Sequence, residues 1–224
     1  MLSLETIFQQ LNDIKVIDDS IPISQYIPID LSKSNIELSK IETNNPIILE
    51  KFIENFVKKR KAKLAYGGYN ELRNLYQSSM LFNNYNDEER NIHLGIDFWI
   101  EAGTNVLAAL DGKIHSFNHN DKPGDYGPTI VLEHTIKKFT FYTLYGHLSL
   151  ESIANLKVGS SITKGQILAK LGGYSINGGY APHLHFQIIK EIGTNYGDYP
   201  GVCNNKDLNF FLANCLDPNL LLKI

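Results

Sequence analysis

Between about residues 90 and 190 the chain is a series of short runs rich in isoleucine, valine, phenylalanine, tyrosine and threonine. The runs are separated by glycine-containing turns such as LDGK, GDYGP, LKVGSSITKG and LGGYSINGG. Short β-branched and aromatic runs between glycine turns are typical of antiparallel strands. We therefore predict a mainly β domain, with strands at residues 94–100, 105–109, 113–117, 129–134, 139–147, 166–171 and 183–190.

Helical patterns lie on both sides of this β region. Apolar residues recur at helical spacing between Leu4 and Ile14, and the following segment IPISQYIPID is typical of an extended loop. A second helix is expected after Pro46, with an inward side formed by Ile48, Phe52, Ile53, Phe56 and Val57. The closing segment DLNFFLANCLDPNLLLKI predicts a short helix and an apolar tail. We therefore expect an α+β chain overall, with a helical and extended accessory region at residues 1–80 and the β domain with its tail at residues 81–224.

Composition limits the classes of partner. Of the 224 residues, 43% are hydrophobic, which suffices for a sizeable buried core. The formal net charge of -3 does not supply the basic surface that DNA or RNA binding requires, so no nucleic acid partner is expected. No apolar run is long enough to cross a bilayer, so no transmembrane segment is expected. No signal peptide is visible, which predicts a cytoplasmic location as written, or a periplasmic or extracellular one if a leader was removed.

Two cysteines and three histidines are expected to have structural roles. Cys203 and Cys215 match no short zinc-site or redox spacing, so we expect buried or free thiols, with a disulfide only in a secreted protein. His115 and His119 flank a turn, and His134 ends a predicted strand. We expect these three imidazoles to be structural or to face solvent.

Two further histidines lie one residue apart in the segment APHLHFQII, which otherwise has the pattern of a buried strand. In an extended chain His183 and His185 point to the same face, whereas Leu184 and Phe186 point to the opposite one. By itself such a pair could arise by chance in a chain with seven histidines. The pair gains significance from other histidine-bearing segments.

The segment RNIHLGIDFWI places His93 and Asp97 four residues apart, with Gly95 between them. Four residues of a straight strand span about 13 Å, which is too far for both side chains to reach one ion at about 2 Å. A bend is therefore required, and glycine permits one. Two imidazoles and one carboxylate are the three protein ligands typical of a catalytic zinc site, which keeps a fourth position for water. Non-haem iron uses the same ligand set and stays an alternative.

His147 ends the strongly β segment FYTLYGHLSL and is followed by a polar residue, so its imidazole could lie at the rim of a sheet. Imidazoles that lie near a metal without binding it suit hydrolysis. One can take a proton from water, and another can stabilise the oxyanion or orient the substrate.

The segments HLGID, YGHLS and PHLHFQI resemble, in order and spacing, the signature segments of the lysostaphin and LytM-type zinc endopeptidases, which cut peptide bonds in bacterial cell-wall peptidoglycan. The resemblance extends to GTNVLAALDGKIHSF and VGSSITKGQILAKLGG. It implies an antiparallel two-sheet β fold (a duplicated hybrid motif), with one Zn²⁺ per chain in a groove floored by one sheet. It also implies that His93, Asp97 and His185 bind zinc, and that His147 and His183 form the catalytic pair.

The chain departs from the family pattern before the last motif. The loop GGYSINGGYAP is longer than the usual turn, and Ala181 stands where the family has glycine. We expect Tyr145, Asn177 and Tyr180 to contribute to substrate binding. The segments AYGGYNELRNLYQSSMLF and DPNLLL resemble a subgroup whose relatives are not obviously wall enzymes, which indicates a smaller or intracellular substrate as an alternative.

The leading hypothesis is a zinc endopeptidase that hydrolyses peptidoglycan-type peptides. One alternative is a catalytically silent or regulatory zinc-binding module of the same fold. Another is a hydrolase of a small non-wall substrate. A third is a phosphoryl carrier, because NVLAALDGKI resembles the hammerhead of lipoyl and sugar-phosphotransferase carriers. The first 80 residues could support the fold, form part of the substrate wall or cover the groove, and the sequence does not determine the oligomeric state.

Overall fold

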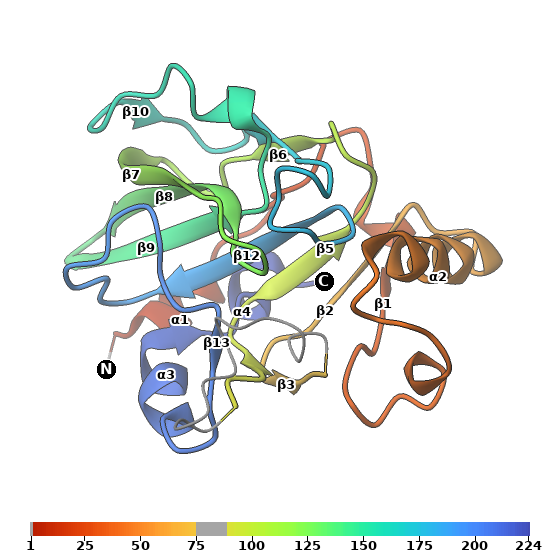
Figure 1. Ribbon diagram of the computed structural model, residues 1–224. Helices are drawn as coiled ribbons and strands as arrows, with labels where there is room; N and C mark the ends of the chain where they lie inside the picture. Colours follow the sequence, from red (N-terminus) through yellow and green to blue (C-terminus); the bar gives the residue numbers. More distant parts are fainter. Residues whose placement is uncertain (1, 75–88) are drawn as a thin grey trace.

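The computed structural model describes residues 2–74 and 89–224, and strands outnumber helices in this part of the chain (Figure 1). The largest sheet runs in the order β1-β2-β5-β12-β9-β8-β7-β10, with β14 paired to β12. Its strands are β1 (Tyr26–Pro28), β2 (Leu64–Gly67), β5 (Ile96–Trp99), β7 (Gly112–Asn120), β8 (Gly127–Ile136), β9 (Phe139–Gly146), β10 (Ser161–Ile162), β12 (His183–Ile189) and β14 (Cys215–Leu216). Apart from the parallel pair of β1 and β2, its paired strands are antiparallel.

Two smaller sheets and several short helices complete the described structure. One small sheet pairs β6 (Asn105–Leu107) with β11 (Ile167–Lys170), and the other orders β13-β4-β3 from β3 (Glu71–Leu72), β4 (Ile92–His93) and β13 (Val202–Cys203). The α-helices are α1 (Leu4–Phe8), α2 (Pro46–Lys59), α3 (Leu208–Asn214) and α4 (Asn219–Leu222). Single 3₁₀ turns occur at Ile23–Gln25, Leu38–Lys40 and Leu150–Ser152.

The prediction of a mainly β fold is confirmed. Each of the seven predicted strands overlaps an observed strand, namely β5, β6, β7, β8, β9, β11 and β12. β7 and β8 are longer than predicted, because their pairing continues to Asn120 and Gly127 beside the turn that joins them. Because β-branched and aromatic residues suit a half-buried pleated surface, these runs identify the strands independently of their distant partners.

The main core lies between the large sheet and the β6–β11 pair. Ile114, Ile130 and Phe186 from the large sheet share one buried cluster with Val106 of β6 and Leu168 of β11. Residues of α1 and α4 belong to the same cluster, so both ends of the chain pack against the sheet. Burial of one large aliphatic or aromatic side chain contributes about 1.5–3 kcal/mol, so the terminal segments add substantially to the core.

The amino-terminal part of the chain is built into the large sheet. β2 pairs with β5, and Figure 1 shows β1 and β2 at the edge of the sheet beside α2. The predicted boundary at residue 80 lies outside the described residues, and the division into two regions stays a prediction. The first helix is shorter than its periodicity indicates, since it ends at Phe8 although Ile14 is also buried. The predicted extended loop contains a 3₁₀ turn followed by β1.

Helix α2 begins where the sequence indicates. Asn45 caps it by accepting hydrogen bonds from the backbone N–H groups of Ile47 and Ile48, and Pro46 occupies the first turn. Ile53 is buried as predicted, whereas Ile48 is half-buried and Leu49, one position further along, is buried instead. The inward side is therefore rotated slightly from the prediction.

The remaining expectations concern membrane spans and cysteines. Within the described residues, no helix is long and apolar enough to cross a bilayer. Cys203 and Cys215 are buried and are not joined in a disulfide, in agreement with the prediction of buried or free thiols. Burial raises the pKa of the Cys203 thiol to about 11 and that of Cys215 to about 12, so neither is a reactive thiolate at neutral pH.

Candidate metal centre and active site

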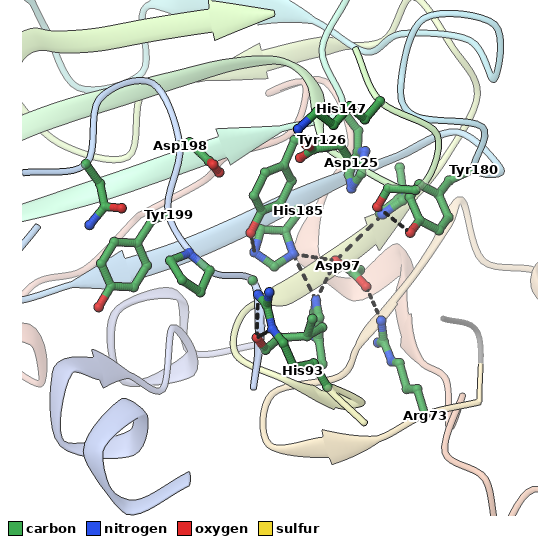
Figure 2. A pocket seen from close by; sticks show the side chains of 18 of the residues that line it. Arg73, His93, Asp97, Asp125, Tyr126, His147, Tyr180, His185, Asp198 and Tyr199 are labelled. Atoms are coloured by element: carbon green, nitrogen blue, oxygen red, sulfur yellow. Dashed lines mark hydrogen bonds and ion pairs between the residues drawn. The ribbon is translucent and has the colours of Figure 1, made fainter. Parts of the chain in front are cut away.

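Three side chains from three strands converge beside the large sheet. His93 ends β4, Asp97 lies in β5, and His185 lies in β12 directly opposite Asp97 in the antiparallel register. Oδ1 of Asp97 lies 3.3 Å from Nε2 of His93 and 3.2 Å from Nδ1 of His185, and the two ring nitrogens are 2.8 Å apart. Figure 2 shows Asp97 beside the two imidazoles. All three side chains are buried.

A bend between two strands brings His93 and Asp97 together. β4 and β5 are separate strands of different sheets, joined through Leu94 and Gly95, which matches the predicted bend. The reason for glycine differs from the prediction, since Gly95 is not among the residues with positive φ. A Cβ atom there would lie 2.7 Å from Cε1 of His185 and 2.7 Å from the carbonyl oxygen of Phe186. Glycine is therefore required by the close approach of the His185 ring.

The donor geometry fits a zinc ion. Ligand atoms about 2.0–2.1 Å from a tetrahedral zinc lie about 3.3 Å from one another, close to the observed separations. Nδ1 of His93 donates to the carbonyl oxygen of Gly68 at 2.9 Å, and Nε2 of His185 donates to Oε1 of Gln187 at 2.9 Å. Each ring therefore directs an unprotonated nitrogen at the other. Nε2 of His93 and Nδ1 of His185 are 2.8 Å apart, so their lone pairs repel each other. A cation bound between the two nitrogens removes this repulsion.

Electrostatics keep the carboxylate charged and the first imidazole neutral. Burial alone would raise the pKa of Asp97, but His93 and the Arg73 guanidinium outweigh it and hold that pKa well below its usual range. Burial, assisted by Arg73, lowers the pKa of His93 to about 4. A charged carboxylate and a neutral imidazole are the protonation states that bind a metal ion.

His147 and His183 lie next to this group. The centroids of their rings are 4.2 Å apart, and Nε2 of His183 is 3.9 Å from Oδ1 of Asp97. Nδ1 of His147 donates to the carbonyl oxygen of Asn177 at 2.7 Å, and Nδ1 of His183 donates to that of Ala181 at 2.8 Å. Since carbonyl oxygens can only accept, Nε2 is the unprotonated nitrogen of both neutral rings.

Burial makes both of these rings weak bases. It lowers the pKa of His183 to about 4, and together with the neighbouring His183 and His185 it brings the pKa of His147 well below its ordinary value. His147 also has left-handed backbone geometry with φ at 64°, which is uncommon for a residue with a side chain. Its N–H donates to the Tyr126 carbonyl and its own carbonyl accepts from Gly172, and these bonds hold the turn.

A pocket of about 320 Å³ opens over these five side chains. The aromatic part of the pocket wall is formed by Trp99, Tyr126 and Tyr180. The charged residues that line the pocket around the five side chains are Arg73, Arg90, Lys122, Asp125 and Asp198. Burial raises the pKa values of Asp125 and Asp198, and the charge of Asp198 raises the pKa of Asp125 further. Figure 2 shows Asp198 and Tyr199 on the side of His185 away from Arg73.

Several lining residues were not predicted from the sequence, and three of them contact the candidate ligands or catalytic histidines. The hydroxyl of Tyr126 lies 3.4 Å from Nε2 of His185, and the Trp99 ring stacks on His183 with centroids 4.0 Å apart. Arg73 is 2% exposed and bonds to Asp97. Trp99 belongs to a predicted strand and Tyr126 to the predicted turn GDYGP, and neither pattern separates an aromatic residue that lines a pocket from one in the core. Arg73 lies in the distant segment YNELRN, and nothing in that polar segment indicates that its side chain is buried.

The three residues expected to bind substrate have different positions. Tyr180 lines the pocket, and its hydroxyl donates to the Gly124 carbonyl at 2.8 Å. Asn177 is buried, and its side chain bonds to the backbone of Gly172 and Tyr180, so it fixes the loop on which His147 depends. Tyr145 is not brought to the pocket. It is buried in the core, where its hydroxyl accepts from the backbone N–H of Ala109.

None of the three histidines expected to be structural lines the pocket. His134 is fully buried, with Nδ1 donating to the Asp111 carbonyl at 2.8 Å and Nε2 2.7 Å from Oγ1 of Thr143. His115 and His119 are half-buried on β7.

Comparison with known proteins agrees with this geometry. Residues 91–198 match the model of peptidase family M23. The chain carries a peptidase family M23 domain of the lysostaphin and LytM type. The matched residues contain His93, Asp97, His147, His183 and His185, whereas Arg73 precedes them.

Curated relatives of this M23 domain are peptidases by name. The chain is 37% identical over 105 residues to glycyl-glycine endopeptidase ALE-1 of Staphylococcus capitis, covering 46% of this chain and 26% of that protein. It is 33% identical over 106 residues to lysostaphin of Staphylococcus simulans, covering 46% and 19%. It is 31% identical over 97 residues to peptidoglycan DD-endopeptidase ShyC of Vibrio cholerae, covering 43% and 20%. The matches thus span about a quarter or less of these relatives.

A solved structure of the catalytic domain of lysostaphin from Staphylococcus simulans is also similar. It is 26% identical in sequence, with a TM-score of 0.37, and the match covers 65% of this chain and 87% of that one.

Proposed function

We propose that this chain is a zinc-dependent endopeptidase that hydrolyses peptide bonds of peptidoglycan-type peptides. The observation that carries the proposal is the convergence of His93, Asp97 and His185 on one point, with His147 and His183 beside them in one pocket. The M23 family match and the named activities of the relatives support the same reaction class.

In this proposal His93, Asp97 and His185 hold the zinc ion. Bound zinc supplies the Lewis acidity that activates water and polarises a peptide carbonyl. His93 and His185 keep their metal-facing nitrogens unprotonated because Gly68 and Gln187 accept the protons of the other ring nitrogens. Asp97 adds the negative charge that the two neutral rings lack.

His147 and His183 handle protons in this proposal. His147 accepts a proton at Nε2, because its Nδ1–H is committed to the Asn177 carbonyl. His183, held by Ala181 and by the stacked Trp99 ring, orients the carbonyl, and it would donate to the developing oxyanion only when the single proton that His147 accepts passes on to its own Nε2. The proton taken up by the pair is then available to the leaving amine.

Metal quantitation combined with digestion tests the proposal. The purified chain is analysed for bound metals and then incubated with purified cell wall and a panel of peptides, and product masses identify the bond that is cut. We expect one zinc per chain and new amine and carboxyl ends in wall peptides, both lost after chelation. Iron in place of zinc would contradict the proposed metal. Stoichiometric zinc with no turnover of any substrate would favour the silent module, and cleavage of small peptides alone would favour a non-wall substrate.

A further inference from the structure

The segment that runs from β2 through a turn to β3 (residues 64–72, the β2–β3 segment) lies against the two strands that carry His93 and Asp97. In the antiparallel registers Gly67 is opposite Asp97, and Glu71 is opposite His93. This segment precedes the residues that match family M23. The metal centre therefore has neighbours that the matched segment does not supply.

Arg73, directly after β3, connects the β2–β3 segment to the metal centre. Its Nη1 donates to Oδ2 of Asp97 at 2.5 Å and its Nε donates to Oε2 of Glu71 at 2.6 Å. Oε1 of Glu71 in turn accepts from the backbone N–H of Leu31 at 3.1 Å. Figure 2 shows the guanidinium on the side of Asp97 away from His185. The two oxygens of Asp97 thus have different partners, Arg73 for Oδ2 and the two imidazoles for Oδ1.

The turn between β2 and β3 fixes His93 as well. The Gly68 carbonyl accepts from Nδ1 of His93, and Gly68 has φ at +110°. A Cβ atom at Gly68 would lie 1.9 Å from Nη2 of Arg73 and 2.9 Å from Nδ1 of His93. Glycine is therefore required by its backbone conformation and by the close packing of both side chains.

A buried guanidinium is costly unless carboxylates pair with it and satisfy its donors. Here Arg73 is 2% exposed and bonds to the carboxylates of Glu71 and Asp97. One positive and two negative charges leave a net charge of one negative unit, which a bound cation can balance. The planar fork of arginine can bond both carboxylates in fixed directions, which the single ammonium of lysine cannot do. The arrangement leaves Oδ1 as the oxygen of Asp97 that faces the other two candidate ligands.

We propose that Arg73 is a positioning residue of the metal centre, which engages Oδ2 of Asp97 so that Oδ1 alone binds the metal. Glu71 holds the guanidinium and Gly68 holds His93, so the β2–β3 segment supports two of the three ligands. This inference rests on the zinc site of the proposed function. A carboxylate bound through both oxygens would fill the coordination position that a catalytic zinc keeps for water.

Zinc affinity and the cobalt spectrum test this inference in the full chain. Arg73→Met removes the charge and keeps an apolar side chain in the buried space, and Arg73→Lys restores the charge without the fork. Zinc affinity is measured by competition with a chromogenic chelator. We expect a loss of about 10–100-fold for Arg73→Met, the range found for outer partners of metal ligands, and a smaller loss for Arg73→Lys. The Co²⁺-substituted variant should absorb more weakly in the visible region, because a second carboxylate oxygen raises the coordination number.

Tyr69→Phe is the matched control from the same β2–β3 segment. It removes the 2.7 Å hydrogen bond from the Tyr69 hydroxyl to the Cys215 carbonyl and leaves the ion pairs untouched. We expect wild-type zinc affinity and an unchanged cobalt spectrum. Should Arg73→Met fail to fold, as judged by circular dichroism of the metal-free chain, Glu71→Gln replaces it, with a several-fold loss of zinc affinity expected.

The outcomes separate this inference from the proposed function. A wild-type chain that binds neither zinc nor cobalt overturns the proposed function and the inference with it. A wild-type chain that binds zinc, together with an Arg73→Met or Glu71→Gln variant of equal affinity and equal cobalt spectrum, overturns the inference alone. A Tyr69→Phe variant that loses as much affinity as Arg73→Met would assign the effect to the β2–β3 segment as a whole and overturn the specific role of Arg73.

Discussion

At the scale of single residues, backbone carbonyls and one amide decide what each imidazole can do. His93, His147 and His183 each donate Nδ1–H to a carbonyl oxygen, whereas His185 donates Nε2–H to Gln187. His185 therefore presents Nδ1 to the metal position, and the other three rings keep Nε2 unprotonated. The sequence identifies the histidines, but their protonation depends on acceptors from distant segments.

Substitutions should separate metal binding from turnover. We expect His93→Ala and Asp97→Ala to lose zinc, because each removes one of three donors, and His147→Ala to keep zinc while losing most of its turnover. Bound zinc is measured by elemental analysis and turnover by release of wall peptides. His119→Ala, on β7 and outside the pocket, is the control and should change neither quantity. Loss of zinc in His147→Ala would contradict the assigned roles.

A methyl group at Gly95 should disturb the centre through sterics alone. The Cβ of Gly95→Ala would lie 2.7 Å from Cε1 of His185 and from the Phe186 carbonyl oxygen, so the ring or the strand must shift. We expect weaker zinc binding and a stability loss of about 1–3 kcal/mol, measured by chelator competition and chemical denaturation. Gly173→Ala is the matched control, because its Cβ would meet no atom within 4 Å. Equal zinc affinity in both variants would refute the steric argument.

At the scale of elements, the centre depends on which strands are neighbours. β5 lies between β2 and β12, so Asp97 has Gly67 on one side and His185 on the other. The sequence indicates most strands and α2, because β-branched runs, the Asn45 cap and Pro46 are local signals. It does not indicate that β2 borders β5, because strand pairing between distant segments leaves no local pattern. For the same reason the contribution of Arg73 was missed.

Removal of the amino-terminal strands should destroy the fold instead of activating it. A chain without residues 1–74 lacks β1, β2 and β3, which exposes the edge of β5, and it lacks buried core residues such as Phe8 and Leu64. We expect an insoluble or unfolded product with little bound zinc, measured by solubility, circular dichroism and metal content. A soluble truncated chain with higher activity than the full chain would instead show that this region covers the groove as an inhibitor.

At the scale of the whole molecule, the site concentrates buried ionisable groups in one place. His93, His147 and His183 are buried with pKa values below the ordinary range, while Arg73 and Asp97 are buried and charged. Such groups stabilise the folded chain only in particular protonation states. The pH dependence of stability therefore reports on the whole centre.

The metal-free chain should lose stability as the pH falls below neutrality. The pKa of His183 is lowered from 6.5 to about 4 by burial, so between these values the unfolded chain binds a proton that the folded chain does not. The stabilisation is fully present above about pH 6.5 and is lost as the pH falls towards about 4, and His93 acts in the same direction. Denaturation midpoints between pH 4 and 8 measure this. A smaller dependence in His183→Gln is expected, and an unchanged one would contradict the assignment to His183.

The sequence by itself determined the class of fold, the positions of the main strands and the order of the histidine-bearing segments. These features depend on local periodicity, turn residues and short motifs, which the chain carries wherever its parts lie in space. The tertiary structure alone decided that Tyr145 is in the core, that Tyr126 and Trp99 line the pocket, and that Arg73 bonds to Asp97. These facts follow from strand order and burial. Both are set by packing among segments far apart in the chain, and short-range sequence patterns do not record them.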